Sequence, residues 1–360
     1  MAGEKYKFGV GICTFNRPNF LKLCLESLPK GDYQVFVLND GGKDVSEVIS
    51  PFKRDNFNYI NRETNLGVAK TKNELLELLL DQGLVHIFLI EDDIILKDQN
   101  VFEKYIEASL ISGIMHFNYG PGSPFNRKQD IQFDLHNRHL LKQNSPPNPK
   151  LVIEYEKGIK VALYEHTVAM FSYFRDIVIK DCGLFPTCYK NCWEHVHHTN
   201  NIIQKGYHPY FWWFSDLFES DLLLEEAPGA IDNSAIATKK EDWMKNVMDG
   251  REIYKNHFGY YPNNPPVFSQ GQVIEQLKQI KNKYASKHRG DKCGNVIDRD
   301  YNAALNLKKC GEEFLRQNTV SSTGINACGD ITSWSGAIQK KVVPKKQEDN
   351  KESTVYYLKV

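Results

Sequence analysis

The chain has 360 residues, of which 41% are hydrophobic, and this length can bury a full α/β core with a smaller segment left over. It carries 45 basic and 45 acidic side chains, so the balance of charge argues against a global attraction to DNA or to a membrane. No apolar stretch approaches the roughly 20 residues of a membrane span. The N-terminus lacks a signal-peptide core, and the cysteines lack the spacing of a disulfide framework. We therefore expect a cytoplasmic protein without a membrane span.

The first ninety or so residues alternate strand-like and helix-like runs, which is typical of βαβ units. Residues 8–14 predict a buried strand that ends at Thr14 and is followed by a polar loop with Asn16 and Arg17. Apolar residues at helical spacing then predict a helix over residues 20–28.

A second strand is predicted over residues 33–38, and it delivers Asp40 into the following loop. An Asp at this place can accept hydrogen bonds from a ribose or a base, although an ordinary Asx turn would also explain it. A third short strand near residues 59–60 precedes the segment from Asn65 to Gly67, and a helix is predicted from there to about residue 81.

Three acidic residues, Glu91, Asp92 and Asp93, follow the apolar run 85–90. Ligands of open α/β sheets bind at the carboxyl ends of the strands. Carboxylates suit Mn²⁺ or Mg²⁺, and such an ion can neutralise the phosphates of a departing nucleotide. An isolated acidic triplet is more often a solvated turn, but the alternating elements before this one favour a metal–diphosphate site.

Four motifs in this half resemble those of the GT-A glycosyltransferases, specifically of family 2. The motifs are residues 10–17, 38–41, 65–73 and 91–93, and they span most of residues 6–96 in the family's order. The resemblance implies an α/β fold of the GT-A type, a Rossmann-like mixed sheet flanked by helices, and a nucleotide-diphospho-sugar as donor.

The resemblance also assigns roles to single residues. It implies a donor pocket, and the residues expected to bind the donor are Thr14, Asn16, Arg17, Asp40, Asn65, Gly67, Lys72 and Asp92. Asp93 is implied as the direct ligand of Mn²⁺ or Mg²⁺. Glu91 stands where the family's first acidic residue is found, and the pattern leaves open whether it contacts the metal or a ribose hydroxyl.

An inverting member of this family needs a general base beyond the acidic triplet. Glu194 resembles the Glu of the family's Glu-Asp motif, with His195 in place of the Asp, and it follows a predicted strand over residues 167–173. A helix start with a solvated acid is the alternative. His195 and His198 could bind a metal on one helical face, or a single histidine, His198 or His208, could complete the metal site.

Two further segments bear on the acceptor. Residues 118–150 are rich in Gly, Pro and polar residues, and they predict a long loop or lid. The aromatic stretch over residues 209–216 is either a buried core strand or a platform on which a sugar or nucleobase stacks.

The C-terminal segment resembles the end of transposon-encoded RNA-guided nucleases of the TnpB type. The residues that carry this resemblance are 293–307, and Asp300 matches the nuclease carboxylate. Because Gly290 stands where a zinc ribbon needs Cys, and because two-metal hydrolysis needs several carboxylates, we interpret residues 286–335 as an inactive captured fragment. Residues 336–360 are expected to be a charged, mobile tail.

The sequence therefore predicts a GT-A domain over residues 1–285, with a nucleotide-binding half over 1–96 and an acceptor half over 97–285. We expect a metal-dependent transfer of a sugar, with inversion, to a hydroxyl of a glycan, a protein or a modified nucleobase. The alternatives are a nucleic-acid-binding protein of transposon origin, a DNA-base-modifying glycosyltransferase and a related nucleotidyltransferase.

Overall fold

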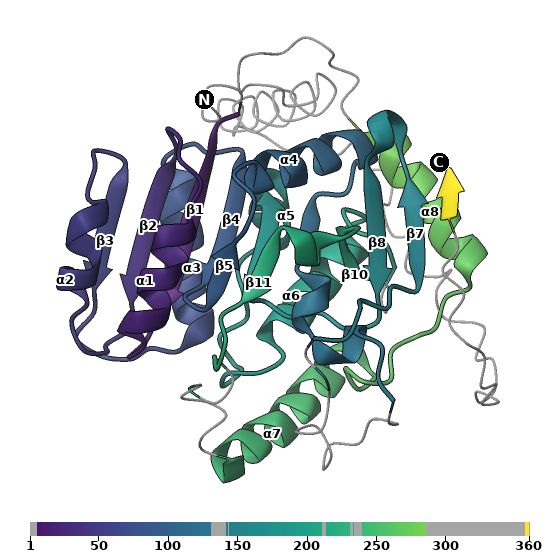
Figure 1. The fold of residues 1–360 in the computed structure, drawn as a ribbon. Coiled ribbons are helices and arrows are strands. Elements are labelled where there is room, and N and C mark those ends of the chain that lie inside the picture. The colour runs from purple at the N-terminus through teal and green to yellow at the C-terminus, as the bar shows by residue number, and fades with distance from the viewer. Residues whose placement is uncertain are drawn as a thin grey trace, which may run out of the picture. The chain divides into compact units, whose positions relative to one another are not determined.

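A six-stranded mixed sheet organises the N-terminal half of the chain in the computed structural model (Figure 1). The structure describes residues 6–130, 142, 144–210, 214–230, 233, 240–285 and 357–359, which all belong to one unit. The order of the strands in the sheet is β3-β2-β1-β4-β9-β6. The predicted mixed α/β sheet flanked by helices is confirmed.

The strands of this sheet are β1 (Phe8–Thr14), β2 (Gln34–Asn39), β3 (Phe57–Asn61), β4 (His86–Glu91), β6 (His116–Asn118) and β9 (Phe171–Arg175). The strands outside it are β5 (Ile94–Leu96), β7 (Leu151–Glu154), β8 (Lys160–Tyr164), β10 (Phe214–Leu217), β11 (Leu224–Glu226) and β12 (Tyr357–Lys359). The helices are α1 (Pro18–Ser27), α2 (Ser46–Ile49), α3 (Val68–Asp81), α4 (Val101–Ser112), α5 (Asp176–Cys182), α6 (Glu194–Gln204), α7 (Lys240–Phe258) and α8 (Gln270–Tyr284).

The register of the parallel strands brings their carboxyl ends to one edge of the sheet. Strands β1, β2, β3 and β4 are parallel, whereas β9 runs antiparallel to β4 and to β6. Thr14 is opposite Asn39, and Cys13 is opposite Glu91. The loop after β1, the loop after β2 and the acidic triplet after β4 therefore leave the sheet side by side.

The two faces of the sheet are covered by different helices, because side chains alternate along each strand. Val35 and Val37 of β2 pack with α1 and α4 on one face, and Phe36 and Leu38 pack with α3 and α5 on the other. On the α3 face, β1 has Gly11, where a Cβ would lie 3.0 Å from the Cβ of Leu75. The missing side chain lets α3 pack closely on the sheet.

The remaining strands form two smaller sheets. Strands β10, β8, β7 and β12 make a four-stranded sheet, and β11 pairs with β5. Strand β12 pairs in parallel with β7, so residues 357–359, at the end of the expected mobile tail, belong to a sheet. Residues 286–356, which include Asp300 and the rest of the expected fragment and tail, lie outside the described residues.

One expectation about the acceptor half needs correction, because the strand expected over residues 167–173 is β9, which begins only at Phe171. In the segment expected to be a long loop or lid, residues 120–126 are two buried turns held by Asn126, whose side-chain amide donates to the carbonyls of Gly120 and His166. Residues 131–141 and 143 of that segment lie outside the described residues. Phe214–Leu217, the described end of the aromatic stretch, is a buried strand, as one of its two interpretations predicted.

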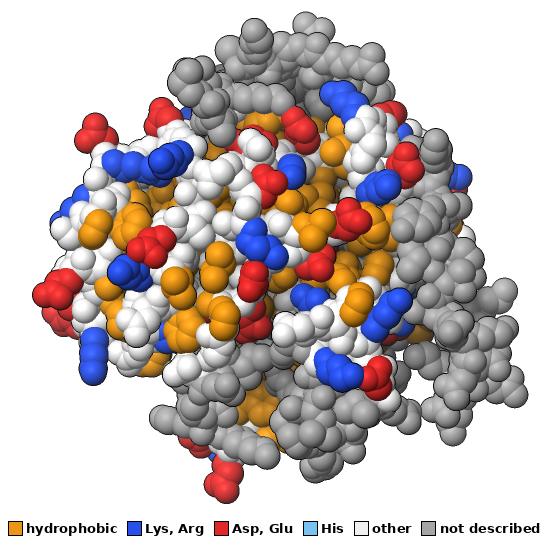
Figure 2. Space-filling view, viewed as in Figure 1, with side chains coloured by type: hydrophobic (Ala, Val, Ile, Leu, Met, Phe, Trp, Pro, Cys, Tyr) orange, Lys and Arg blue, Asp and Glu red, His pale blue; other side chains and the backbone are white. Residues whose placement is uncertain are grey.

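In the described part of the chain, every helix is too short or too polar to span a bilayer. On the face shown in Figure 2, Lys and Arg side chains are interspersed with Asp and Glu side chains. Charge of one sign does not dominate the described part of this face.

Candidate active site

The loop after β1 is tied to the acidic triplet after β4 by direct hydrogen bonds. The Thr14 hydroxyl donates to Asp92 Oδ2 at 2.6 Å, and Arg17 Nη1 donates to Asp93 Oδ2 at 2.7 Å. The other guanidinium nitrogen of Arg17 pairs with Asp92 Oδ1. Arg17 thus bridges two carboxylates that are themselves buried. The structure brings together these four predicted site residues.

At this edge of the sheet, the carboxylates of Asp92 and Asp93 are buried and lie close to that of Glu91. Burial raises the pKa of Asp92 to about 7, although the charge of Arg17 acts in the opposite direction. Burial and then the charge of Glu91 raise the pKa of Asp93. Burial alone would lower the pKa of Arg17, but the charges of Asp92 and Asp93 outweigh it and raise that pKa. One guanidinium therefore serves two carboxylates.

Asp40 organises the loop before α3. Its Oδ1 accepts from Leu66 N at 2.9 Å and from Arg62 at 2.7 Å, and its Oδ2 accepts from Gly67 N at 2.9 Å. The predicted donor-binding role of Asp40 remains a prediction, but the structure gives this carboxylate a local role as well. It fixes the backbone beside Asn65, whose side chain is exposed.

Asn16 lies in the loop that faces this segment. Its backbone has a positive φ of 56°, and its side-chain oxygen accepts from Lys43 N at 2.8 Å. Asn16 is exposed, and its hydrogen bond joins the loops after β1 and β2.

Lys72 does not point into an open donor pocket. The side chain is buried, and its ammonium donates to Glu91 Oε1 at 2.7 Å and to the carbonyl of Ala169 at 2.9 Å. Burial alone would lower the pKa of Lys72, but the charge of Glu91, assisted by those of Cys13 and Glu194, raises it. The predicted contact between Lys72 and the donor stays a prediction, and the contact that the structure gives this ammonium is with Glu91.

Glu194 is the first residue of α6, and its side chain is buried. Oε1 lies 3.3 Å from His195 Nδ1, whereas Oε2 is buried without a partner among the described residues. Burial acts to raise the pKa of Glu194, but the hydrogen bond and charge of His195 and the charge of Lys72 outweigh it and lower that pKa. Glu194 and Glu91 thus share an electrostatic partner in Lys72.

Helix α7 holds the turn that precedes Glu194. The Trp193 indole donates to the carbonyl of Val247 at 3.0 Å, and a Cβ on Gly250 would lie 2.7 Å from the Trp193 ring. Trp193 itself has a left-handed backbone, with φ at 65°. This contact determines where α6 begins.

A fourth carboxylate lies near Glu91, Asp92 and Asp93, at the part of the sheet that we call the acidic edge, and it was not predicted. Glu226 of β11 interacts electrostatically with Asp93, Glu91 and Arg17. It reaches the triplet because β11 pairs with β5, which directly follows the triplet. Sequence reasoning missed Glu226 because this strand pairing joins segments more than a hundred residues apart, and a three-residue strand has no local signal that identifies its partner.

The predicted metal role of His198 and His208 stays a prediction, and His198 Nδ1 is buried without a hydrogen-bond partner among the described residues. His198 Nε2 lies 2.8 Å from the carbonyl of Gly183, and its ring packs on Phe185. His208 Nδ1 lies 2.8 Å from its neighbouring carbonyl at Pro209, and its Nε2 accepts from Ser215 N at 3.2 Å. Both rings are buried, and each has one or more contacts with backbone atoms.

The acidic edge offers carboxylates, which are ligands that divalent cations prefer, but too few of them to complete the coordination with protein atoms alone. Among the residues that the structure describes, no three His, Cys, Asp or Glu side chains are placed to hold a metal ion together. Asp93 Oδ1 is nevertheless buried without a hydrogen-bond partner in the same part of the chain. Mg²⁺ and Mn²⁺ are commonly held by one or two carboxylates and completed by substrate phosphates, so these residues fit such an ion.

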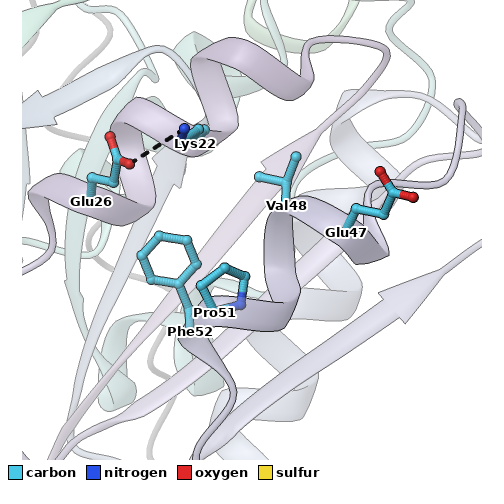
Figure 3. A pocket seen from close by; sticks show the side chains of 6 residues that line it. All are labelled: Lys22, Glu26, Glu47, Val48, Pro51 and Phe52. Atoms are coloured by element: carbon cyan, nitrogen blue, oxygen red, sulfur yellow. Dashed lines mark ion pairs between the residues drawn. The ribbon is translucent and has the colours of Figure 1, made fainter.

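A surface hollow lies apart from the acidic triplet, between α1 and α2 (Figure 3). Its volume is about 280 Å³, and it is lined by Lys22, Glu26, Glu47, Val48, Pro51 and Phe52. Lys22 and Glu26 form an exposed ion pair at 3.8 Å within it. No member of the triplet lines the hollow, so the chemistry of the acidic edge is separate from it.

The chain is therefore an α/β protein in which the parallel strands of the main sheet end beside a cluster of carboxylates. Residues 9–171 match the family described as Glycosyl transferase family 2. A protein of Acanthamoeba polyphaga mimivirus, named as an uncharacterised glycosyltransferase, is 31% identical over 126 residues, which cover 32% of this chain and 48% of the relative. The chain thus spans about half the length of the curated relative it matches.

Two of the solved structures to which this chain is similar are the following. The mannosyltransferase PcManGT from Pyrobaculum calidifontis, in complex with GDP-Man and Mn²⁺, is 10% identical, with a TM-score of 0.46 over 88% of this chain and 83% of its own. S. aureus TarS 1–349 is 14% identical, with a TM-score of 0.41 over 78% of this chain and 82% of its own.

Proposed function

We propose that this chain is a glycosyltransferase that moves a sugar from a nucleotide-diphospho-sugar to an acceptor hydroxyl, with inversion and with the help of a divalent cation. The match of residues 9–171 to family 2 supports the reaction class. The observation that carries the proposal is the buried Glu194, which is coupled through Lys72 to Glu91 of the acidic edge. A base and a diphosphate site must lie close together in such an enzyme.

Asp93 and Glu91 are the residues at this edge that we expect to hold a divalent cation. Bound there, Mn²⁺ or Mg²⁺ would supply positive charge to the phosphates of the departing nucleoside diphosphate. Arg17 keeps Asp92 and Asp93 in place by bridging them. Asp92 acts mainly as the anchor of Arg17 and Thr14, because both of its oxygens already accept bonds from them.

The donor nucleotide is proposed to bind over the loops after β1 and β2 and over the loop before α3. Asn16 and Asn65 present exposed side chains there. Asp40 fixes the third of these loops through the amides of Leu66 and Gly67. A preformed loop loses less conformational entropy when a ligand binds.

Glu194 is proposed to take the proton from the acceptor hydroxyl. Its lowered pKa keeps the carboxylate ionised at neutral pH, and its unpartnered Oε2 is free, among the described contacts, to accept that proton. His195 holds Oε1 and so fixes the direction of the carboxylate. General-base catalysis of this kind contributes typically about 10²- to 10⁴-fold to the rate.

The test measures donor binding and turnover in the same variants. Thermal shift with UDP, GDP, CDP and TDP sugars, with and without Mn²⁺, identifies the donor that the full chain binds. Release of the nucleoside diphosphate from that donor then reports turnover, with water or an added sugar as acceptor. We expect Glu194→Gln to bind the donor like the wild type and to lose about a hundredfold or more in turnover.

The matched control is Asp93→Asn, for which we expect loss of the Mn²⁺-dependent part of the thermal shift. Full turnover in Glu194→Gln would assign the base to another residue. If the wild type showed no shift with any of the donors, the glycosyltransferase proposal itself would be contradicted.

A further inference from the structure

Glu226 occupies a position that faces the protein core. In the antiparallel pair of β5 and β11, Leu224 is opposite Leu96 and Glu226 is opposite Ile94. Directly opposed residues point to the same face of a sheet. Leu224, Leu96 and Ile94 are all buried in the main core with α1. The alternation along β11 therefore puts a carboxylate on the inner face, where an apolar side chain is expected.

The backbone of this ribbon brings Glu226 to the acidic triplet. Ala227 N, the next amide in the chain, donates to the carbonyl of Asp93 at 2.7 Å. Among the described residues, the Glu226 carboxylate makes no hydrogen bond and no ion pair, although it is half-buried. A carboxylate in such a place is costly unless a cation or a donor is bound to it.

The charges at this edge remain unbalanced. Arg17 is engaged by Asp92 and Asp93, and Lys72 is engaged by Glu91. Asp93 Oδ1 is buried and also lacks a partner in the described part of the chain. Asp93 Oδ1 and the Glu226 carboxylate, from distant segments, thus both lack a hydrogen-bond partner among the described residues.

We propose that Glu226 is a ligand of the divalent cation, together with Asp93. Asp93 directly precedes β5 and Glu226 ends β11, so each of the two paired strands would supply one ligand. The phosphates of the donor would complete the coordination. This inference rests on the proposed function, because it names a further residue of the same cation site. It explains why a carboxylate stands at an inward position of β11.

The experiment titrates the full-length chain with MnCl₂ alone and measures free Mn²⁺ by EPR. We expect Glu226→Gln to weaken Mn²⁺ binding by about tenfold or more, which is the scale seen when a metal site loses a supporting group. Glu225→Gln is the matched control, because Glu225 is exposed in the same strand and pairs with Lys97 at 3.5 Å. Its affinity for Mn²⁺ should equal that of the wild type.

Thermal unfolding without metal provides a readout that separates a ligand from a structural residue. Glu226→Gln removes an unpaired charge, so we expect its melting temperature without Mn²⁺ to equal or exceed that of the wild type. Glu226→Asp keeps the charge on a shorter side chain and should bind Mn²⁺ with an intermediate affinity. A lower melting temperature with unchanged Mn²⁺ affinity in Glu226→Gln would overturn the inference.

The variants also distinguish this inference from the proposed function. If Asp93→Asn abolishes Mn²⁺ binding and Glu226→Gln binds like the wild type, the proposed function stands and Glu226 is no ligand. If the wild type itself does not bind Mn²⁺, the proposed cation site and the role of Glu226 are both refuted.

Discussion

Lys72 connects the two halves of the candidate active site at the scale of single residues. Its ammonium holds Glu91 and the Ala169 carbonyl, and its charge acts on Glu194. A buried lysine is costly unless it is paired, and here the pairing places one positive charge between a donor-side carboxylate and the proposed base. We infer that Lys72 is a positioning residue, because its charge, after the hydrogen bond and charge of His195, lowers the pKa of Glu194.

Replacing Lys72 by Met should move the pH dependence of turnover. Because the charge of Lys72 lowers the pKa of Glu194, its loss raises that pKa, and the acid limb of the kcat profile shifts to higher pH. The measurement is nucleoside diphosphate release between pH 4 and pH 9. Lys72→Arg, which keeps the charge, should retain the wild-type acid limb. A lower rate with an unmoved acid limb would show that Lys72 serves packing alone.

At the scale of elements, the strands and helices of the first ninety residues were predictable, and the contacts between distant elements were not. The strand over 8–14 and the helix ending at Asp81 follow from local periodicity, and the observed bounds agree. The partner of Lys72 and the position of Glu226 depend instead on strand pairing and helix packing across the fold. His198 appeared as a metal candidate because its ring chemistry is visible in the sequence, whereas its contact with Gly183 is not.

Gly11 tests how closely α3 and β1 must pack. A Cβ there would lie 3.0 Å from Leu75 Cβ and from Leu89 Cδ2, so Gly11→Val overpacks the interface and should cost about 1–3 kcal/mol in the free energy of unfolding. Urea denaturation measures this change. Gly271→Ala in α8 is the control, since no atom lies within 4 Å of the added carbon, and its stability should be unchanged or slightly higher. Equal midpoints for Gly11→Val and the wild type would contradict close packing.

At the scale of the whole molecule, buried histidines make the fold sensitive to acid. Burial lowers the pKa of His198 and of His208 to about 4, whereas an unfolded histidine has a pKa near about 6.5. Between these values the unfolded chain binds more protons than the native one. The stability supplied by these neutral rings is therefore full above pH 6.5 and is lost as the pH falls toward 4.

We expect the urea midpoint of the wild type to fall between pH 7 and pH 5. Asp216, Asp92 and Glu226 act in the opposite direction, because burial raises the pKa of each to about 7, so the net slope is smaller than the sum of the histidine contributions. His198→Phe removes one titrating ring from a site lined by Phe174 and Phe185, and its midpoint should vary less with pH. An equal pH dependence in the two proteins would show that His198 does not contribute.

The pairing of β12 with β7 changes how the chain can be divided. Helix α8 and strand β12 belong to one unit, and residues 286–356 lie between them in the sequence. Ending the chain after α8 would remove residues 286–356 and would also leave one side of β7 without its neighbour, and an unpaired strand edge favours association between molecules. A deletion that joins residue 285 to residue 357 through a linker would keep both α8 and β12, and it would separate the contribution of residues 286–356 from that of the strand.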